Sequence, residues 1–311
     1  MKTIIPIILS SDDNYAKYLS VTLVSILANG EKDTFYDVYV LMATNFSDAN
    51  NQMIQKDANA YSNNKINFID MKNAFSSLDV KRKRLNVPTF YRLNAAEILP
   101  KNYDKCLYFD VDIIVNTDLK ELFNTEMGNN IIAGVRDNGT KIDARYWVEK
   151  FVNKKWKIPD YKSYVNAGVL ILNLKKIREE NLTKVFNDEA NNNYSFADQD
   201  VVNKVCYGRI TILPLKYNLM TIFDYRKFWL FYKSFWSKDE IYKAYENPKV
   251  IHFCVTWKPW FRPKARLAKY WWKYAAKSVY LQEIIKLNAE KRKTKKKYLK
   301  QVSKCLKAIN K

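Results

Sequence analysis

Apolar and polar residues follow one another along the first half of the chain in an order typical of alternating strands and helices. Short β-branched runs predict three buried strands, at 3–9, 37–44 and 65–70. Helical spacing predicts the helices between and after them, at 15–28, 48–62 and 89–99. This alternation predicts an α/β fold, with a mainly parallel central sheet that carries helices on both faces.

The second half of the chain continues the pattern more loosely. Further apolar runs predict strands at 107–109, 113–115, 169–172 and 249–253, and a short helix at 201–206. Parallel sheets bind ligands outside the carboxyl ends of their strands, and residues 12–15 and 110–112 both fall at such ends. The chain has only six glycines and no glycine-rich phosphate loop, so neither dinucleotide binding nor ATPase chemistry is supported.

Asp110 and Asp112 interrupt the otherwise apolar stretch 105–115, KCLYFDVDIIV. An ionised carboxylate beside a buried strand is costly unless it is paired or binds a metal. The pair therefore indicates a site for a hard divalent cation, Mg²⁺ or Mn²⁺, which usually also holds substrate phosphates. The competing interpretation is a plain turn, because aspartate is common there.

Later polar residues also have both a functional and a structural interpretation. Asn166 stands before a strand and a glycine, and it either presents its amide to a ligand or only forms a turn. Asp198 either belongs to a site or caps the helix that follows it. His252, the only histidine, is either a structural residue or a third metal ligand that suits Mn²⁺ better than Mg²⁺. Lys258 offers a point charge for a diphosphate.

The net charge of +21 is concentrated at the end of the chain. Residues 261–311 contain 17 basic and two acidic residues, a net charge of +15, which leaves +6 for residues 1–260. The four cysteines show no zinc spacing, the N-terminus has no secretory apolar segment, and no apolar run is long enough to span a membrane. We therefore expect a cytoplasmic protein with its thiols reduced.

Residues 261–311 are predicted to form a basic, aromatic helical extension of a catalytic domain at 1–260. On a helix, one stripe would contain Leu267, Trp271, Tyr274, Leu281 and Ile285. An aromatic stripe beside basic residues is typical of a membrane interface, and the lysines of 291–300 would add attraction to anionic lipid. The alternative is a helix that packs on the body, followed by a disordered tail.

Taken in chain order, these motifs resemble those of glycosyltransferase family 8, and most closely its bacterial lipopolysaccharide and lipooligosaccharide hexosyltransferases. The resemblance covers about residues 3–260. It rests on Ser10-Ser11-Asp12-Asp13-Asn14-Tyr15, Tyr91-Arg92, Asp110-Val111-Asp112, Asn166-Ala167-Gly168-Val169, Asp198-Gln199-Asp200 and His252 followed by Lys258-Pro259-Trp260.

The resemblance implies a GT-A fold and a retaining transferase that moves galactose or glucose from a UDP-sugar, with Mn²⁺, or alternatively Mg²⁺, as cofactor. The residues that it places on the nucleotide and diphosphate are Ser10, Asp12, Asn14, Tyr15, Arg92, Asp110, Val111, Asp112 and Lys258. The metal ligands that it implies are Asp110, Asp112 and His252. The residues beside the donor sugar would be Asn166, Asp198 and Gln199, with Asp137 toward the acceptor.

The implied position of Gln199 bears on the mechanism. Double displacement needs a carboxylate nucleophile beneath the anomeric carbon, and an amide is a poor nucleophile. Front-face attack, in which the departing phosphate takes the acceptor's proton, is therefore favoured, with Asp198 as a transient nucleophile as the alternative. Val255 departs from the resemblance, because family members often have a glycine there against a phosphate.

The expected acceptor is a glycan or glycolipid of cell-surface polysaccharide synthesis, and the basic loop 81–84 favours an anionic one, or is merely solvated. The expected location is the inner face of the cytoplasmic membrane, bound peripherally through the tail. Two rival functions are a family member that binds sugar nucleotides without transfer and a nucleic-acid-binding protein. No nucleic-acid-binding signature appears in the chain, so no nucleic-acid partner is expected.

Overall fold

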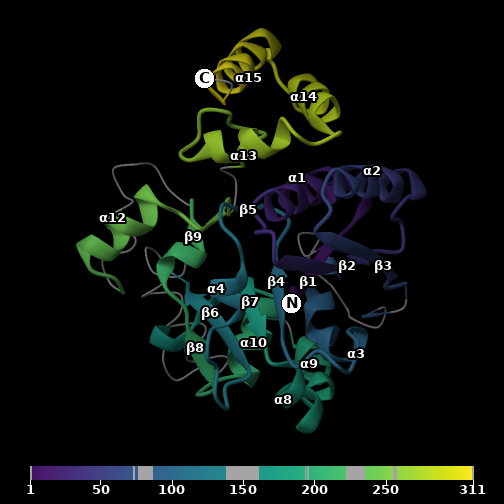
Figure 1. Ribbon diagram of the computed structural model, residues 1–311, viewed down its shortest axis with the longest axis vertical. Helices are drawn as coiled ribbons and strands as arrows, with labels where there is room; N and C mark the ends of the chain where they lie inside the picture. The colour runs from purple at the N-terminus through teal and green to yellow at the C-terminus, as the bar shows by residue number, and fades with distance from the viewer. Residues whose placement is uncertain are drawn as a thin grey trace.

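A computed structural model describes residues 2–72, 74–75, 87–137, 161–192, 194, 196–221, 235–254 and 258–309. Its centre is a seven-stranded sheet with the strand order β3-β2-β1-β4-β7-β6-β8 (Figure 1). The strands are β1 Thr3–Ser11, β2 Thr34–Met42, β3 Asn64–Asp70, β4 Cys106–Phe109, β6 Ile132–Arg136, β7 Val165–Leu172 and β8 Ile210–Ile212. All strand pairs are parallel except those that β7 makes with β4 and β6. The predicted α/β fold with a mainly parallel sheet is confirmed.

Helices cover both faces of this sheet. Successive residues of β1 point to opposite faces, so neighbouring residues of this strand belong to different cores. Ile7 and Leu9 belong to the core under α1 (Ala16–Leu27) and α2 (Asp48–Asn59). Ile8 belongs to a second core on the other face. Its helices are α3 Ala95–Ile98, α8 Leu174–Glu179, α9 Leu182–Ala190 and α10 Asp198–Val205, with the 3₁₀ segment η2 Val87–Asn94. Every residue of α1 is buried, so something must also cover its outer side.

A small second sheet brings distant segments to the end of the first. It has the order β5-β10-β9 and consists of β5 Ile113–Val115, β10 Val250–His252 and β9 Leu219–Met220. The antiparallel pairing of β5 with β10 sets His252 opposite Ile113. Residues 110–112 therefore cross from one sheet to the other, where β4 ends and β5 begins.

Two predicted helices differ in the structure. The helix predicted over 89–99 is the 3₁₀ segment η2 followed by one turn, α3, because Arg92 turns its Nε back to the carbonyl of Thr89 at 2.9 Å and directs the rest of its guanidinium elsewhere. The helix predicted at 201–206 begins earlier, at Asp198, and the N-cap is Ala197. Asp198 is therefore in the first turn of α10 rather than at its cap.

The remaining short elements connect these layers. They are η1 Asp13–Tyr15, α4 Lys120–Phe123, η4 Tyr161–Ser163, η5 Leu215–Tyr217 and α12 Lys238–Glu246. Two segments singled out in the sequence, the basic loop 81–84 and Val255, lie outside the described residues.

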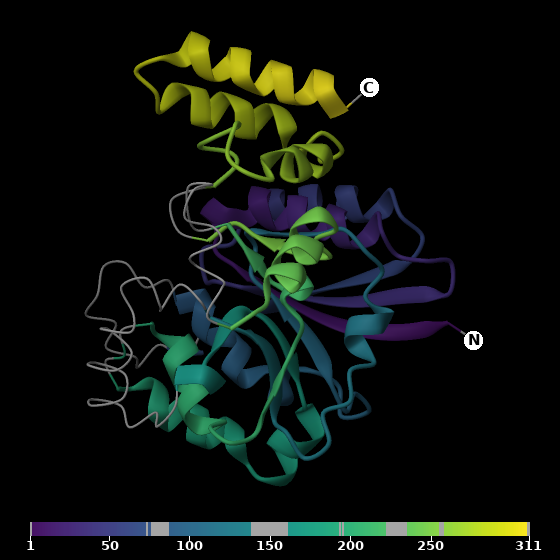
Figure 2. The same ribbon diagram turned by 90° about the vertical axis from the view of Figure 1, so that its left-hand side faces the viewer.

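The C-terminal segment forms three helices, α13 Ala268–Ala275, α14 Leu281–Glu290 and α15 Lys295–Ile309. They make an outer layer over α1, in yellow and green at the top of Figures 1 and 2. Trp271 and Trp272 of α13 have no exposed surface. Trp260, just before this layer, stacks on Tyr18 of α1 with ring centroids 4.0 Å apart. The aromatic stripe thus packs on the body, and the prediction that it faces a membrane is wrong.

A buried carboxylate fastens this layer to the body. Asp57 of α2 accepts hydrogen bonds from Ser20 of α1 and from Ser278, both at 2.6 Å, and from the backbone N–H of Val279 at 2.8 Å. Ser278 lies where the predicted single helix breaks between α13 and α14. The polar anchor therefore lies at the break between the two helices. Among the described residues, no helix combines the length and the apolarity needed to cross a bilayer. The division at residue 260 into a domain and an extension stays a prediction.

Candidate active site

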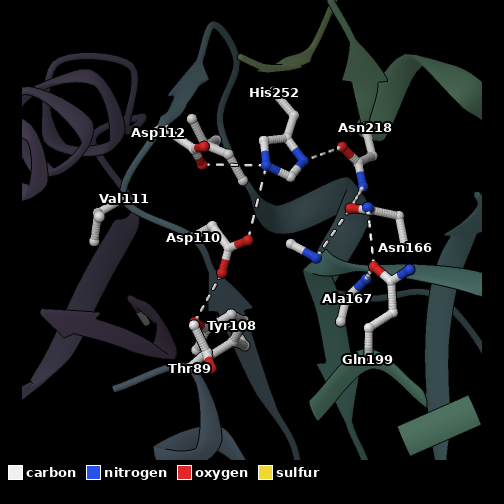
Figure 3. A network of polar contacts seen from close by, with 12 residues as sticks. Thr89, Tyr108, Asp110, Val111, Asp112, Asn166, Ala167, Gln199, Asn218 and His252 are labelled. Carbon is white, nitrogen blue, oxygen red and sulfur yellow. Dashed lines mark hydrogen bonds and ion pairs between the residues drawn. The ribbon is translucent and has the colours of Figure 1, made fainter. Parts of the chain in front are cut away.

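Asp110, Asp112 and His252 meet where the two sheets join (Figure 3). One ligand atom from each lies within 4.8 Å of the others. His252 Nε2 is 3.1 Å from Asp112 Oδ1 and 3.7 Å from Asp110 Oδ2. His252 is far from the two aspartates in the chain, and the β5–β10 pairing brings it beside them.

Asn218 decides which imidazole nitrogen faces the carboxylates. Its Oδ1 lies 3.1 Å from Nδ1 of His252, while its Nδ2 donates to Asn166 Oδ1 at 2.9 Å. Because an amide oxygen only accepts, Nδ1 carries a proton, and Nε2 is the ring nitrogen directed at the two carboxylates. Once Nε2 is deprotonated it offers a lone pair there, and Asp112 Oδ1 is buried without a hydrogen-bond partner among the described residues. Three converging electron-pair donors fit a divalent cation of the kind that accepts oxygen and imidazole ligands.

Gly168 makes room for the imidazole. A Cβ at this position would lie 2.2 Å from Cε1 and 2.7 Å from Nδ1 of His252, and 2.9 Å from Asp110 Oδ2. The carbonyl of Gly168 also accepts the N–H of Asp110 at 2.8 Å. Any side chain here would displace the ring, so glycine is required by close approach.

A pocket of about 340 Å³ opens beside this group on the side of β1. Its lining includes seven residues that the sequence placed on a nucleotide: Ser10, Asp12, Tyr15, Asp110, Val111, Asp112 and Lys258. Lys258 Nζ contacts Asp112 Oδ2, and Lys258 and His252 outweigh the effect of burial and hold the pKa of Asp112 below its usual range. Tyr15, with 37% of its surface exposed, presents a ring to the opening.

Two residues of the predicted nucleotide set lie elsewhere. Asn14 is exposed and does not line the pocket; its carbonyl accepts from Lys17 Nζ at 3.0 Å. Arg92 is buried beneath the site, with its guanidinium 3.8 Å from the centre of the Tyr108 ring. Its NH2 donates to Asp110 Oδ1 at 2.8 Å, so it orients a carboxylate from below.

Arg92 also reaches the second carboxylate of interest. Its Nε lies 3.0 Å from Asp198 Oδ2. Burial raises the pKa of Asp198 to about 6, against the lowering effect of Arg92 and with a further increase from Asp110. The residue before it, Ala197, has a φ of 51°, a strained backbone for a residue with a side chain. Asp198 is therefore held close to the metal group in a costly environment.

A network of amides continues from the metal group toward α10 (Figure 3). Gln199 Oε1 accepts from Asn166 Nδ2 at 3.1 Å and from the N–H of Ala167 at 3.0 Å. Gln199 Nε2 donates to Asp137 Oδ2 at 2.7 Å, and Asn166 Nδ2 donates to the same oxygen at 3.2 Å. The structure thus joins Asn166, Gln199 and Asp137 in one hydrogen-bonded network, whereas their roles toward the donor sugar and the acceptor stay predictions.

Sequence reasoning missed Asn218 and Tyr108. Asn218 is fully buried and joins His252 to Asn166, whereas Tyr108 donates to Asp110 Oδ1 at 2.9 Å. In the sequence, Tyr108 lies two positions before Asp110 in an apolar strand, and this position indicates a core aromatic residue. Asn218 follows the 3₁₀ segment η5 as an isolated polar residue, and no pattern in the chain distinguishes it from a turn asparagine.

The family model described as "Glycosyl transferase family 8" matches residues 6–264 of the chain. Among curated proteins, a putative glycosyltransferase of Haemophilus influenzae is 34% identical over 217 residues, which span 68% of this chain and 62% of that protein. The lipopolysaccharide 1,2-glucosyltransferase of Escherichia coli is 28% identical over 181 residues, 56% of this chain and 49% of that one.

Solved structures agree in fold. The galactosyltransferase LgtC, in a complex with donor and acceptor sugar analogs, superposes with a TM-score of 0.69 at 28% identity, covering 88% of this chain and 96% of that one. The bifunctional glycosyltransferase WbbM has a TM-score of 0.77 at 24% identity over 92% of this chain and 52% of its own. The architecture is thus the GT-A fold of such enzymes.

Proposed function

This chain belongs to glycosyltransferase family 8, and from that premise we propose that it is a retaining, metal-dependent hexosyltransferase. The donor is a UDP-hexose, UDP-galactose or UDP-glucose, and the acceptor is a hydroxyl of a glycan or glycolipid. The observation that carries the proposal is the convergence of Asp110, Asp112 and His252 beside the pocket of Tyr15 and Lys258. The names of the related lipopolysaccharide glucosyltransferase and of LgtC support a hexose donor and a cell-surface glycan.

The pocket side of the site suits the nucleotide. Asp12 is part of the lining, and the ring of Tyr15 offers a face for the uracil base. A divalent cation bound by the Asp-Asp-His group, Mn²⁺ with Mg²⁺ as the alternative, would supply positive charge for the diphosphate. Lys258 lies on the same side and adds a fixed cation against the charge that develops on the leaving group.

The amide side of the site suits the sugar. Asn166 donates to Gln199 Oε1, and both amides donate to Asp137 Oδ2, so their groups are oriented before a substrate arrives. A network that orients Gln199 rather than a free carboxylate favours front-face attack, in which the leaving phosphate accepts the acceptor's proton. Asp198 acting as a transient nucleophile is the alternative, and its contact with Arg92 keeps it next to the site.

The test is UDP release from each UDP-hexose with Mn²⁺, with Mg²⁺ and with a chelator. Turnover that needs the metal and is lost in Asp112→Ala, with the fold retained by circular dichroism, supports the proposal. The anomeric proton coupling of the product, read by NMR, tests retention. Full activity in chelator contradicts the metal requirement. Binding of a UDP-hexose without turnover on any acceptor would favour the alternative of a binding protein without transferase activity.

We propose that the protein binds to the inner face of the cytoplasmic membrane. Because the aromatic stripe packs on the body, the contact is made by α15. The exposed lysines of this helix are Lys295, Lys296, Lys297, Lys300, Lys304 and Lys307. Each is worth about 1 kcal/mol near an anionic surface and is screened by salt. Binding to phosphatidylglycerol vesicles should therefore weaken as salt rises, and neutral phosphatidylcholine vesicles should not bind. The free state of the four cysteines agrees with a reducing compartment.

A further inference from the structure

A second pocket lies in the C-terminal layer, away from the nucleotide pocket. It has a volume of about 570 Å³ and lies between the segment 261–265 and the start of α15. Among the described residues, its lining contains no acidic residue and four cationic ones, Arg262, Lys264, Arg292 and Lys297. Like charges around one hollow repel each other, and an anion placed among them removes that cost. None of its lining residues lines the nucleotide pocket.

Arg292 is held in position by its neighbours. Its NH2 donates to the carbonyl of Phe261, and its guanidinium lies 5.1 Å from the centre of the Tyr298 ring. Tyr298 is itself buried, and its hydroxyl donates to the carbonyl of Trp260 at 3.0 Å. A guanidinium has five N–H donors in a planar fork, and a fork already fixed in place suits the bidentate binding of a phosphate.

The first turns of α15 add to the positive potential. Thr294, Lys297, Tyr298 and Gln301 line the pocket, and this spacing of three and four residues places them on one face of the helix. The helix is 15 residues long, so the positive end of its dipole is at Lys295, beside the pocket. The hydroxyl of Thr294 and the amide of Gln301 are further groups able to donate to an anion.

The segment around the pocket has a large excess of positive charge. Residues 261–311 contain two acidic residues against 17 basic ones. One of the two, Glu283, forms an ion pair with Lys17 of α1 at 3.3 Å. An anion in the pocket would therefore lie in a positive potential.

We propose that this pocket binds a ligand with a multiply charged phosphate, either a phosphomonoester or a diphosphate. Such a group could come from a membrane lipid headgroup or from a soluble compound, and both present the same chemistry to the four cations. The site is close to the nucleotide pocket along the chain, because the N–H groups of Phe261 and Arg262 donate to the carbonyl of Lys258 at 3.0 and 2.9 Å. The inference depends on the pocket alone and not on the transferase proposal.

The test compares two double variants of the full chain that change the net charge equally. Lys264→Glu with Lys297→Glu reverses two charges of the pocket. Lys56→Glu with Lys65→Glu reverses two exposed charges of the body, outside the pocket and outside α15. Inorganic pyrophosphate is titrated by calorimetry in metal-free buffer, and Lys258→Ala checks for binding in the nucleotide pocket instead. Vesicles with phosphatidic acid or with phosphatidylglycerol, matched in surface charge, provide the lipid arm.

Loss of two charge-assisted contacts should weaken pyrophosphate binding at least about tenfold in the pocket variant, with less than about twofold change in the control. Pyrophosphate binding with that pattern supports a soluble ligand. A preference for phosphatidic acid that the pocket variant loses and the control keeps supports a lipid headgroup. Equal losses in both double variants, loss in Lys258→Ala alone, or no binding of either probe by the unmodified protein would overturn the proposal.

Discussion

His252 Nδ1 and Asn218 Oδ1 lie 3.1 Å apart in a fully buried contact, and this contact fixes the imidazole tautomer. Removing such a partner behind a metal-binding histidine typically lowers metal affinity by about 10–100-fold. We expect Asn218→Ala to weaken Mn²⁺ binding by that factor, measured by calorimetry. Asn218→Asp keeps the acceptor for Nδ1 but loses the donor to Asn166 Oδ1, so it should recover only part of the affinity. An unchanged affinity in Asn218→Ala would show that the tautomer is set in another way.

Gly168→Ala should damage the same group by displacing the ring. The added Cβ would lie 2.2 Å from His252 Cε1. Because the backbone fixes the position of Cβ, no side-chain rotation can relieve this contact. We expect Mn²⁺ affinity to fall by at least about tenfold, with a stability cost of about 1–3 kcal/mol from overpacking. Gly128→Ala is the control, because Gly128 has a φ of 53° and nothing within 4 Å, so it strains the backbone without touching the site. Equal metal affinity in the two variants would contradict this account.

The pKa of Asp198, raised to about 6 by burial, predicts an acid limb in the rate profile. Below that pH the carboxyl group is protonated and neutral, so it can no longer stabilise the positive charge that develops on the donor sugar. We expect kcat/KM to fall with decreasing pH below about 6, and Asp198→Asn to be slower but flat between about pH 5 and 7. The same limb in the variant would assign it to another group.

The raised pKa of Asp198 also determines the direction in which the stability of the folded state changes with pH. The unfolded chain loses this proton near pH 3.9 and the folded protein near 6, so between these values the folded state binds more protons. At this group, stability therefore decreases as pH rises from about 4 to 6. Chemical unfolding of the protein and of Asp198→Asn across that window should show a smaller decrease in the variant.

Trp271→Ala should destabilise the whole protein and not only its last helices. The side chain has no exposed surface and lies 5.3 Å from Trp260 and 6.5 Å from Tyr18 between ring centres. Truncation of a buried tryptophan costs about 3–5 kcal/mol. Trp271→Phe is the matched control, because the indole N–H has no hydrogen-bond partner and the phenyl ring keeps much of the packing. A free energy of unfolding unchanged in Trp271→Ala would mean that the layer unfolds independently.

The sequence predicted the part of the site that follows from local pattern. A carboxylate pair at the end of an apolar strand is unusual enough to indicate Asp110 and Asp112, and the mainly parallel α/β architecture follows from the alternation of strands and helices. Asn218 gave no such signal, since its role depends on the pairing of β9 and β10, which joins segments far apart in the chain. The prediction of an α-helix at 89–99 was wrong, because helical spacing does not report the tertiary contacts of Arg92 with Asp110 and Asp198.

The tail shows a different limit. A stripe with Trp271 and Tyr274 has the same spacing whether it faces lipid or α1, because both environments are apolar. The information that decides between them lies in Asp57 and Ser278, whose contact spans 221 positions of the chain. The lysine-rich segment, expected to be disordered in the alternative interpretation, forms α15 because Tyr298 and Val302 are buried against the layer beneath.

The cover that α13 provides for α1 has a consequence for biosynthesis. α1 leaves the ribosome early, and the helix that buries its outer side comes near the end of the chain. At about 5–20 residues per second, the apolar outer surface of α1 waits on the order of tens of seconds for its partner. During that interval Tyr18 has neither Trp260 nor Trp271 beside it. The nascent chain should therefore depend on a chaperone such as a ribosome-bound holdase. This dependence should increase when translation slows between residues 28 and 268.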